Sequence, residues 1–215
     1  MQTKIIKIDK FNPEKEKISE VVEVLIKSGV IAFPTDTVYG IGVNALNKKA
    51  VKRIYEIKKR DKNKPLIILV GRKKDAHKIS HFNATAQKCE VRFWPGPLTL
   101  VLPAKKDIPK YLTYNGTIGI RMPNNKIFIA LAKSCEFPIA TTSANLSGET
   151  SATSAQEVAE KLGLPGEASA KTDEDIDLII DGGRTKSNVA STVLNLTSKT
   201  PKIIRQGKIT LKQIK

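Results

Sequence analysis

The chain has 215 residues, of which 40% are apolar and 27% charged, so it can bury a core and is unlike a disordered protein. Its 37 lysines and arginines against 21 acidic residues give a formal charge of +16, which favours polyanionic partners such as nucleotides or RNA. The N-terminus lacks a signal peptide's apolar core, and no apolar run approaches the roughly 18 residues of a membrane span. We therefore expect one cytoplasmic domain over residues 1–215, without membrane contact.

Helix signals recur along the chain. The first helix is predicted to begin at Asn12-Pro13-Glu14, with Asn12 as its N-cap, and to end before Gly29. Further helices are predicted over residues 47–59, 84–93, 126–133 and 154–163, the last from the capping-box pattern Ser154-x-x-Glu157. Short lysine runs such as Lys73-Lys74 are typical of solvated surface.

Short β-type runs alternate with these helices. The run Leu66 to Val70 is continuously apolar, as expected of a strand buried on both faces beneath helices. The remaining runs cover residues 5–8, 30–33, 98–102, 117–122, 139–143, 178–180, 191–196 and 203–205. Loops rich in glycine, serine and charge are expected at 145–151, 163–172 and 182–188. This alternation predicts an α/β fold with one large mixed sheet of parallel and antiparallel strands flanked by helices.

Several kinds of chemistry are not indicated. The two histidines, His77 and His81, have no acid at triad-like positions, and neither nucleotide signature, GxGxxG nor GxxxxGK[ST], occurs. Cys89 and Cys135 have no CxxC spacing, so buried thiols are expected in place of a disulfide or a zinc site. A bound nucleotide would have to be held by cationic side chains.

Two strand ends are dense in hydroxyl groups, and both could orient small polar ligands. One is the segment 33–42, Phe-Pro-Thr-Asp-Thr-Val-Tyr-Gly-Ile-Gly, which is predicted to leave a strand as a loop. The other is the segment 138–148, Pro-Ile-Ala-Thr-Thr-Ser-Ala-Asn-Leu-Ser-Gly. The alternative explanation is structural: an Asx or ST turn in the first, and an ordinary strand end with turn-forming residues in the second.

One cluster of cations and two single arginines are candidates for binding an anion. Five lie within the seven residues from Lys58 to Lys64, a pattern suited to clamping a triphosphate, although the carbonyl end of a helix also attracts cations. Thr117, Gly119 and Arg121 share one strand face by period two. Arg121 and Arg205 need anionic partners, either a ligand or a structural salt bridge.

Taken together and in order, seven motifs resemble the YrdC-like family over about Val22 to Gly207: PTDTVYG, KxR followed by KPL, FWPGPLTLVL, TIGIRMP, TTSANLSG, STV and IIRQG. The resemblance implies a twisted α/β sheet around a deep basic cavity. It also implies a nucleotidyltransferase that condenses L-threonine, bicarbonate and ATP into L-threonylcarbamoyladenylate and pyrophosphate. The activated group would then pass to N6 of adenosine 37 in tRNA, through transferase partners and with possible direct tRNA contact.

The same resemblance assigns roles to residues. It implies a KxR/SxN tetrad at the catalytic centre, ATP contacts, and threonine contacts in which Arg121 receives the carboxylate. The catalytic positions are Lys58, Arg60, Ser143 and Asn145; the ATP positions are Arg60, Lys64, Thr117, Asn145, Thr153 and Arg205; the threonine positions are Thr37, Arg121, Ser143 and Ser191. Mg²⁺ is expected to accompany ATP, with no metal site made by protein side chains alone.

Two departures from the longer family members are visible. A histidine that they carry late in the KPL strand is Leu69 here, which puts one threonine contact in doubt. Their additional C-terminal domain is missing, and the chain ends about ten residues after IIRQG, so we expect the short form of the family.

The resemblance suggests a mechanism with little need for a catalytic histidine. A carbamate formed on threonine attacks the α-phosphorus of ATP, and Lys58, Arg60 and Arg205 act by positioning and electrostatics. As exposed cavity cations, Lys58 and Arg60 should be replaceable by alanine without loss of the fold.

Two other functions remain open. The first is an RNA-binding module without nucleotide turnover; aromatic residues make up only 5% of the chain and do not alternate with basic residues as in RNA-stacking motifs. The second is a carbamoyl-transferring domain of a larger maturation enzyme, but the acylphosphatase and zinc-finger segments that accompany such domains are not found.

Overall fold

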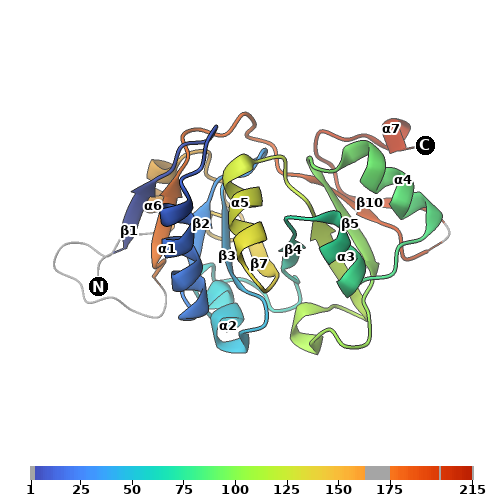
Figure 1. Ribbon diagram of the computed structural model, residues 1–215. Coiled ribbons are helices and arrows are strands. Elements are labelled where there is room, and N and C mark those ends of the chain that lie inside the picture. Colours follow the sequence, from blue (N-terminus) through green and yellow to red (C-terminus); the bar gives the residue numbers. More distant parts are fainter. Residues whose placement is uncertain (1–2, 163–174, 199, 215) are drawn as a thin grey trace.

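One mixed sheet runs through the protein (Figure 1). The computed structural model describes residues 3–162, 175–198 and 200–214, and ten strands pair within them. The strands are β1 (Lys4–Lys7), β2 (Ile31–Phe33), β3 (Gly40–Asn44), β4 (Ile67–Leu69), β5 (Leu98–Pro103), β6 (Thr117–Arg121), β7 (Ile139–Ser143), β8 (Leu178–Asp181), β9 (Thr192–Asn195) and β10 (Lys202–Arg205). Their order is β1-β8-β2-β3-β7-β4-β6-β5-β9-β10, with parallel pairs β1–β8, β2–β8, β4–β6 and β5–β9 among antiparallel ones. The predicted α/β fold with a mixed sheet is confirmed.

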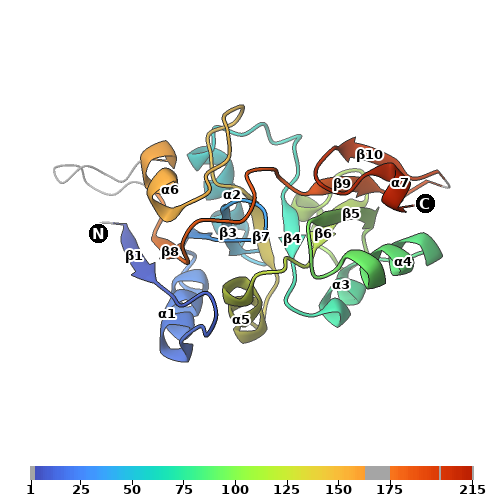
Figure 2. The same cartoon turned by 90° about the horizontal axis from the view of Figure 1, so that it is seen from above.

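Helices cover both faces of this sheet. They are α1 (Lys15–Ile26), α2 (Lys48–Ile57), α3 (Lys73–Ile79), α4 (Ala84–Phe93), α5 (Lys126–Ser134), α6 (Ala155–Leu162) and α7 (Leu211–Ile214), with a 3-10 turn η1 (Lys110–Leu112). Seen from above, α1 and α5 lie on one side of β2, β3 and β7, and α2 and α6 lie on the other (Figure 2). None of the helices in the described ranges has the length and apolar character needed to span a bilayer.

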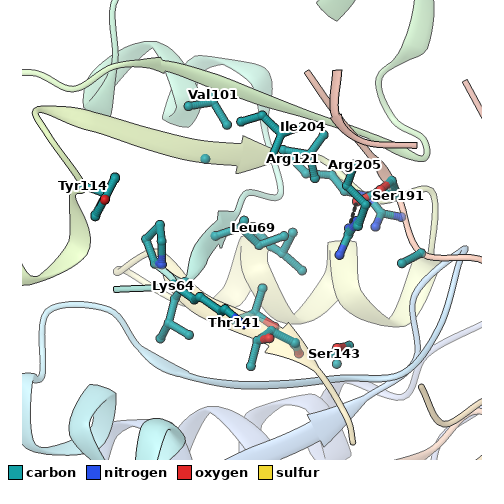
Figure 3. A pocket seen from close by; sticks show the side chains of 18 of the residues that line it. Lys64, Leu69, Val101, Tyr114, Arg121, Thr141, Ser143, Ser191, Ile204 and Arg205 are labelled. Atoms are coloured by element: carbon teal, nitrogen blue, oxygen red, sulfur yellow. Dashed lines mark hydrogen bonds between the residues drawn. The ribbon is translucent and has the colours of Figure 1, made fainter. Parts of the chain in front are cut away.

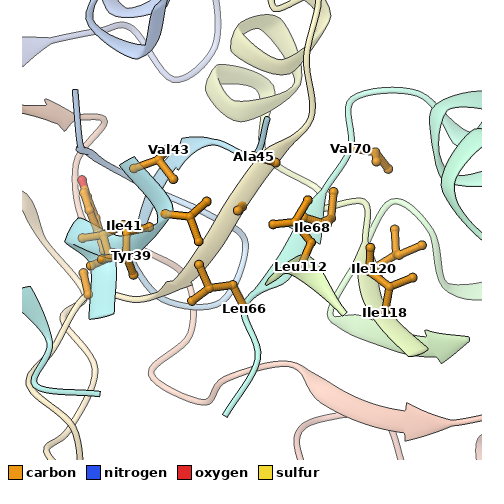
Figure 4. Packing of buried hydrophobic residues seen from close by; sticks show 14 of the residues in the cluster. Tyr39, Ile41, Val43, Ala45, Leu66, Ile68, Val70, Leu112, Ile118 and Ile120 are labelled. Atoms are coloured by element: carbon orange, nitrogen blue, oxygen red, sulfur yellow. The ribbon is translucent and has the colours of Figure 1, made fainter. Parts of the chain in front are cut away.

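Two apolar clusters form the core, one on each face. The larger extends from Ile41 and Val43 of β3 across the sheet to Ile118 and Ile120 of β6 (Figure 4). The smaller packs α1 and α5 against β1, β2 and β8, and it includes Ile139 of β7. Since side chains alternate along a strand, consecutive residues of β7 belong to different clusters.

The face covered by α1 and α5 becomes an open cavity farther along β7. Thr141 and Ser143 follow Ile139 at period two, and both line this cavity. On the same face of β3, Gly42 leaves room for the side chains of both neighbouring strands, since an added Cβ would lie 2.8 Å from Ile139 Cγ2 and 2.8 Å from Phe33 Cε1. The uncovered half of one sheet face is therefore where polar side chains gather.

The predicted start of the first helix is wrong. Glu14, with extended backbone angles, occupies the N-cap position, and the helix begins at Lys15. Asp9 explains the shift, because its carboxylate accepts from the backbone N–H groups of Phe11 (2.7 Å) and Asn12 (3.3 Å) and holds them in a turn. Asn12 therefore does not cap the helix, which ends at Ile26, before Gly29 as predicted.

Two later helix starts, those of α2 and α6, were predicted to within one residue. Asn47 Oδ1 accepts from the backbone N–H of Ala50 at 3.1 Å and begins α2. Ser154 Oγ accepts from the N–H of Glu157 at 3.2 Å, as its capping-box pattern predicts. Helices α4 and α5 follow their predicted ranges to within one residue. The predicted loop 163–172 and the helix end at 163 lie outside the described residues.

One strand and two α-helices were not predicted, and neither was the 3-10 turn η1. Strand β3 lies where the sequence predicted a loop, because two glycines in five residues weaken the strand signal and its stability comes from pairing with β2 and β7. In the region of helix α3, the Lys73-Lys74 run was interpreted as solvated surface, whereas Ala76 of the same helix is buried. Helix α7 has four residues and none of them is buried, so it has no apolar stripe to detect.

Candidate active site

A cavity of about 830 Å³ opens over the centre of the sheet (Figure 3). Its charged lining residues are all cations, Arg60, Lys64, Arg121 and Arg205, and among the described residues no carboxylate lines it. The volume suits a nucleotide together with a small second ligand. The predicted basic cavity is therefore present, and its charge favours an anionic ligand.

Hydroxyl groups line one end of the cavity and also stabilise its wall. The hydroxyls of Thr35 and Thr37 lie 2.9 Å apart, Thr35 Oγ1 donates to Val38 O at 2.7 Å, and Thr37 N–H donates to Thr35 Oγ1 at 3.1 Å. The local turn proposed as the structural alternative is thus formed. It holds Thr37 in the lining, so the two interpretations of this segment are compatible.

Arg121 is buried and held on three sides. Its guanidinium pairs with Asp36, Nη1 donates to Thr37 Oγ1 at 3.0 Å, and Nε donates to Gly96 O at 3.0 Å. Burial lowers the pKa of Arg121, while the carboxylate of Asp36 opposes that change. The structural salt bridge considered for this residue is present. Three of its five N–H groups have these partners, and the residue also lines the cavity.

Arg205 has no such acid. Its Nε donates to Ser191 O and its Nη2 to Ser191 Oγ, both at 3.0 Å, and Ser191 Oγ also lies 2.8 Å from Thr99 Oγ1. Arg205 is an exposed residue, but partial loss of water around its guanidinium is the largest cause of its lowered pKa, followed by the positive charges of Arg121 and Arg60. No carboxylate in the part of the chain that the structure describes pairs with it. The positive charges of Arg121 and Arg60 act on Arg205, and a bound anion would offset this repulsion.

Arg60 reaches the cavity from the end of α2. Its Nε donates to Lys64 O at 2.9 Å and its Nη2 to Pro65 O at 3.2 Å, so the guanidinium stabilises the segment that leads into β4. Burial is the main cause of its lowered pKa. Arg60 and Lys64 both line the cavity, as predicted for phosphate contacts.

Lys58 does not lie in this cavity, so its description as an exposed cavity cation is wrong. Only 1% of the residue is exposed. Its Nζ donates to Ser143 O at 2.5 Å, to Asn145 O at 2.5 Å and to Asn145 Oδ1 at 3.5 Å. The amide of Asn145 in turn donates to Leu146 O and Glu149 O. Lys58 and Asn145 therefore lie behind the wall that Arg60 and Ser143 present to the cavity.

Of the other residues predicted for the site, most line the cavity and one does not. The four threonine positions, Thr37, Arg121, Ser143 and Ser191, all line the cavity, as do Thr117 and Leu69. Thr117, Gly119 and Arg121 share one face, as their spacing predicts. Thr153 instead lines a separate pocket of about 240 Å³, where its hydroxyl contacts Glu157 and accepts from Arg184 Nη1 at 2.6 Å.

Several lining residues were not singled out from the sequence. Thr141 and Tyr114 are the clearest. Thr141 could have been found, because it lies at period two between Ile139 and Ser143 on a predicted strand. Tyr114 gives no such signal, since it precedes a strand and its placement depends on a turn.

The titration of Lys58 should make the free energy of unfolding depend on pH. Burial, and then the charge of Arg60, lower the pKa of its amine from 10.5 to about 7, while the surrounding oxygens favour the protonated form. Between these values the unfolded chain binds more protons, so this group makes the protein more stable as pH rises. We expect the unfolding free energy of wild type minus that of Lys58→Met to increase from pH 7 to pH 9 in urea denaturation. If this difference in unfolding free energy is the same at pH 7 and pH 9, the lowered pKa of Lys58 is wrong.

Comparison with known proteins identifies the family. The family model named for Sua5, YciO and YrdC, described as "Telomere recombination", matches residues 23–207. The chain belongs to this family. The resemblance predicted from the motifs over about residues 22–207 is confirmed.

Named relatives of this Sua5/YciO/YrdC chain include two proteins called threonylcarbamoyl-AMP synthase. Those from Pyrococcus abyssi and Bacillus subtilis are each 40% identical, over 203 and 212 residues. The alignments cover 94% and 96% of this chain but only 57% and 58% of those relatives. A putative threonylcarbamoyl-AMP synthase from Methanocaldococcus jannaschii is 36% identical and matches over 100% of this chain and 98% of its own length.

Solved structures of the Sua5/YciO/YrdC family have the same fold. P. abyssi Sua5 complexed with L-threonine has a TM-score of 0.88 at 40% identity, covering 99% of this chain and 60% of the other. E. coli YciO has a TM-score of 0.87 at 27% identity, covering 99% of both chains.

Proposed function

We propose that this chain is a nucleotidyltransferase that makes threonylcarbamoyl-AMP and pyrophosphate from L-threonine, bicarbonate and ATP. The observation that carries the proposal is the cavity in which Arg60, Arg121 and Arg205 converge with no lining carboxylate among the described residues. The names of the relatives support it, and so does the similarity to a Sua5 protein complexed with L-threonine. Supply of the group for modification of adenosine 37 in tRNA, direct tRNA contact, transferase partners and a cytoplasmic location belong to the same proposal.

Threonine would occupy the hydroxyl-rich end. Arg121 would receive its carboxylate, and the hydroxyls of Thr37, Ser143 and Ser191 line the same cavity. Asp36 already balances the charge of Arg121, so Arg205 is the cation left to neutralise further negative charge there. Leu69 contributes only an apolar surface to this end.

The triphosphate would contact Arg60, Lys64 and Arg205. Thr117, Asn145 and Thr153 remain proposed ATP contacts, although the Asn145 amide is engaged with the backbone and Thr153 lies in the separate pocket. Mg²⁺ that arrives with ATP would be held by phosphate oxygens and water, since no carboxylate lines the cavity and the described residues form no His, Cys, Asp and Glu cluster suited to a metal.

The reaction then needs alignment and charge neutralisation. The threonine amine adds to bicarbonate-derived CO₂ and loses a proton to give a carbamate. A carbamate oxygen forms a bond to the α-phosphorus of ATP, the bond from that phosphorus to its bridging oxygen breaks, and pyrophosphate leaves with the electron pair. Arginines fixed by the backbone stabilise the negative charge that spreads over the phosphoryl oxygens. Lys58 and Asn145 contribute by holding the wall in place.

Pyrophosphate release tests this function. Folded protein supplied with ATP, Mg²⁺ and bicarbonate should release pyrophosphate only when L-threonine is added, and D-threonine should replace it poorly. Release that does not depend on L-threonine, or no release by protein that binds ATP, would reject the proposal. In that case retained RNA binding by Arg60→Ala would favour the alternative of an RNA-binding module.

A further inference from the structure

The cavity has an aromatic side that the proposed contacts leave unused. Tyr114 lies across the cavity from the hydrogen-bonded pair Ser191 and Arg205 (Figure 3). The other tyrosine of the lining, Tyr39, is fully buried, whereas Tyr114 is 47% exposed. Within the described ranges no aromatic ring or cation stacks on Tyr114. Its ring is therefore available to a ligand.

A tight turn fixes where this ring stands. Tyr114 N–H donates to Thr117 O and Thr117 N–H donates to Tyr114 O, both at 3.0 Å. The two residues between them, Asn115 and Gly116, have positive φ angles of 49° and 70°, as a two-residue hairpin turn of type I′ requires. The Thr117 hydroxyl donates a third bond, to Tyr114 O, at 2.7 Å. The turn presents Tyr114 at the start of β6, the strand that also carries Arg121.

The lining of the cavity contains apolar as well as cationic side chains. Cations and hydroxyls suit the phosphates and the amino acid, but a purine base needs a flat apolar surface. Apolar side chains of Val101 and Ile204 line the same cavity, and Ile204 is 59% exposed. Tyr114 is the aromatic group that can complete such a surface.

We propose that Tyr114 stacks on the base of ATP and that Thr117 acts as a positioning residue, by holding the Tyr114 turn through its hydroxyl. The inference rests on the proposed function, because it requires ATP in this cavity. It assigns base binding to the 114–117 turn, a role separate from the phosphate contacts of Arg60 and Arg205.

Comparing ATP with inorganic triphosphate separates base binding from phosphate binding. For Tyr114→Ala we expect affinity for ATP to fall about tenfold, as loss of one stacked base contact implies, with affinity for triphosphate unchanged. Tyr114→Phe keeps the ring face and should bind ATP as wild type does. In turnover, Tyr114→Ala should raise the KM for ATP with little change in kcat.

Fluorescence gives a second measurement. In Tyr114→Trp, ATP should quench the new tryptophan while triphosphate should not, and the native Trp94 is only 4% exposed and serves as background. Added to Tyr114→Trp, Thr117→Val should reduce the quenching by ATP, whereas Thr117→Ser keeps the hydroxyl bond to Tyr114 O and should retain it. Added to Tyr114→Ala, Thr117→Val should cause no further loss of ATP affinity if Thr117 acts through Tyr114, and a further loss would show that Thr117 contacts ATP directly.

The outcomes distinguish this inference from the proposed function. If wild type binds ATP and Tyr114→Ala binds it equally well, or loses ATP and triphosphate affinity alike, stacking by Tyr114 is wrong and the synthase proposal stands. If wild type binds neither compound, both are wrong.

Discussion

Replacing Lys58 with alanine should lower the free energy of unfolding by about 3 kcal/mol, because it removes a buried amine from its oxygen acceptors. The acceptors are Ser143 O, Asn145 O and Asn145 Oδ1, and they would be left without this donor at a place where Lys58 and Asn145 are both buried. Urea denaturation monitored by circular dichroism measures the change.

The matched control is Lys62→Ala, four residues along the chain. Lys62 is exposed, so its removal should change the unfolding free energy by less than about 0.5 kcal/mol. Equal stability of Lys58→Ala and wild type would show that Lys58 does not hold the cavity wall. That result would restore the expectation of a replaceable cavity cation.

Replacing Arg205 with alanine should reduce kcat/KM for threonylcarbamoyl-AMP formation about 100-fold while leaving the melting temperature close to wild type. Arg205 pairs with no described acid, and its nearest charges, Arg121 and Arg60, repel it, so the folded protein gains little from its presence. Its Nε and Nη2 groups face Ser191 at the threonine end of the cavity.

Two variants test whether the effect of Arg205 comes from net charge or from the geometry of its guanidinium. Lys202→Ala removes an exposed cation from the same strand and should keep full activity, which excludes a general effect of net charge. Arg205→Lys keeps the charge but loses the two-pronged donor, and it should recover only part of the activity. Equal losses of stability and activity in Arg205→Ala would contradict a role in anion binding.

Contacts between distant segments account for most of what the sequence did not predict. Lys58 bonds to residues 85 and 87 positions away, and Arg121 pairs with an aspartate 85 positions away. A local pattern of charges shows that cations gather near Lys58, but it does not show which of them turns inward. For the same reason β3 was missed, since its stability depends on β7 about 100 residues later.

Where a residue's position follows from its own strand, prediction from the sequence succeeded. The period-two alternation correctly placed Thr117 and Arg121 on one face of β6, and the start of α2 was predicted to within one residue. The family motifs also led to the four threonine positions, all of which line the cavity. Their functional roles, and the extent of the domain over residues 1–215, remain predictions.

Detection of the adduct itself tests the central claim most directly. Protein incubated with ATP, Mg²⁺, L-threonine and ¹³C-bicarbonate should form threonylcarbamoyl-AMP that carries one ¹³C atom, measured by mass spectrometry after rapid separation. The labelled product should be absent without L-threonine and strongly reduced in Arg205→Ala. If folded wild-type protein binds ATP and L-threonine but forms no labelled adduct, the assignment of this cavity as a threonylcarbamoyl-AMP synthase site is wrong.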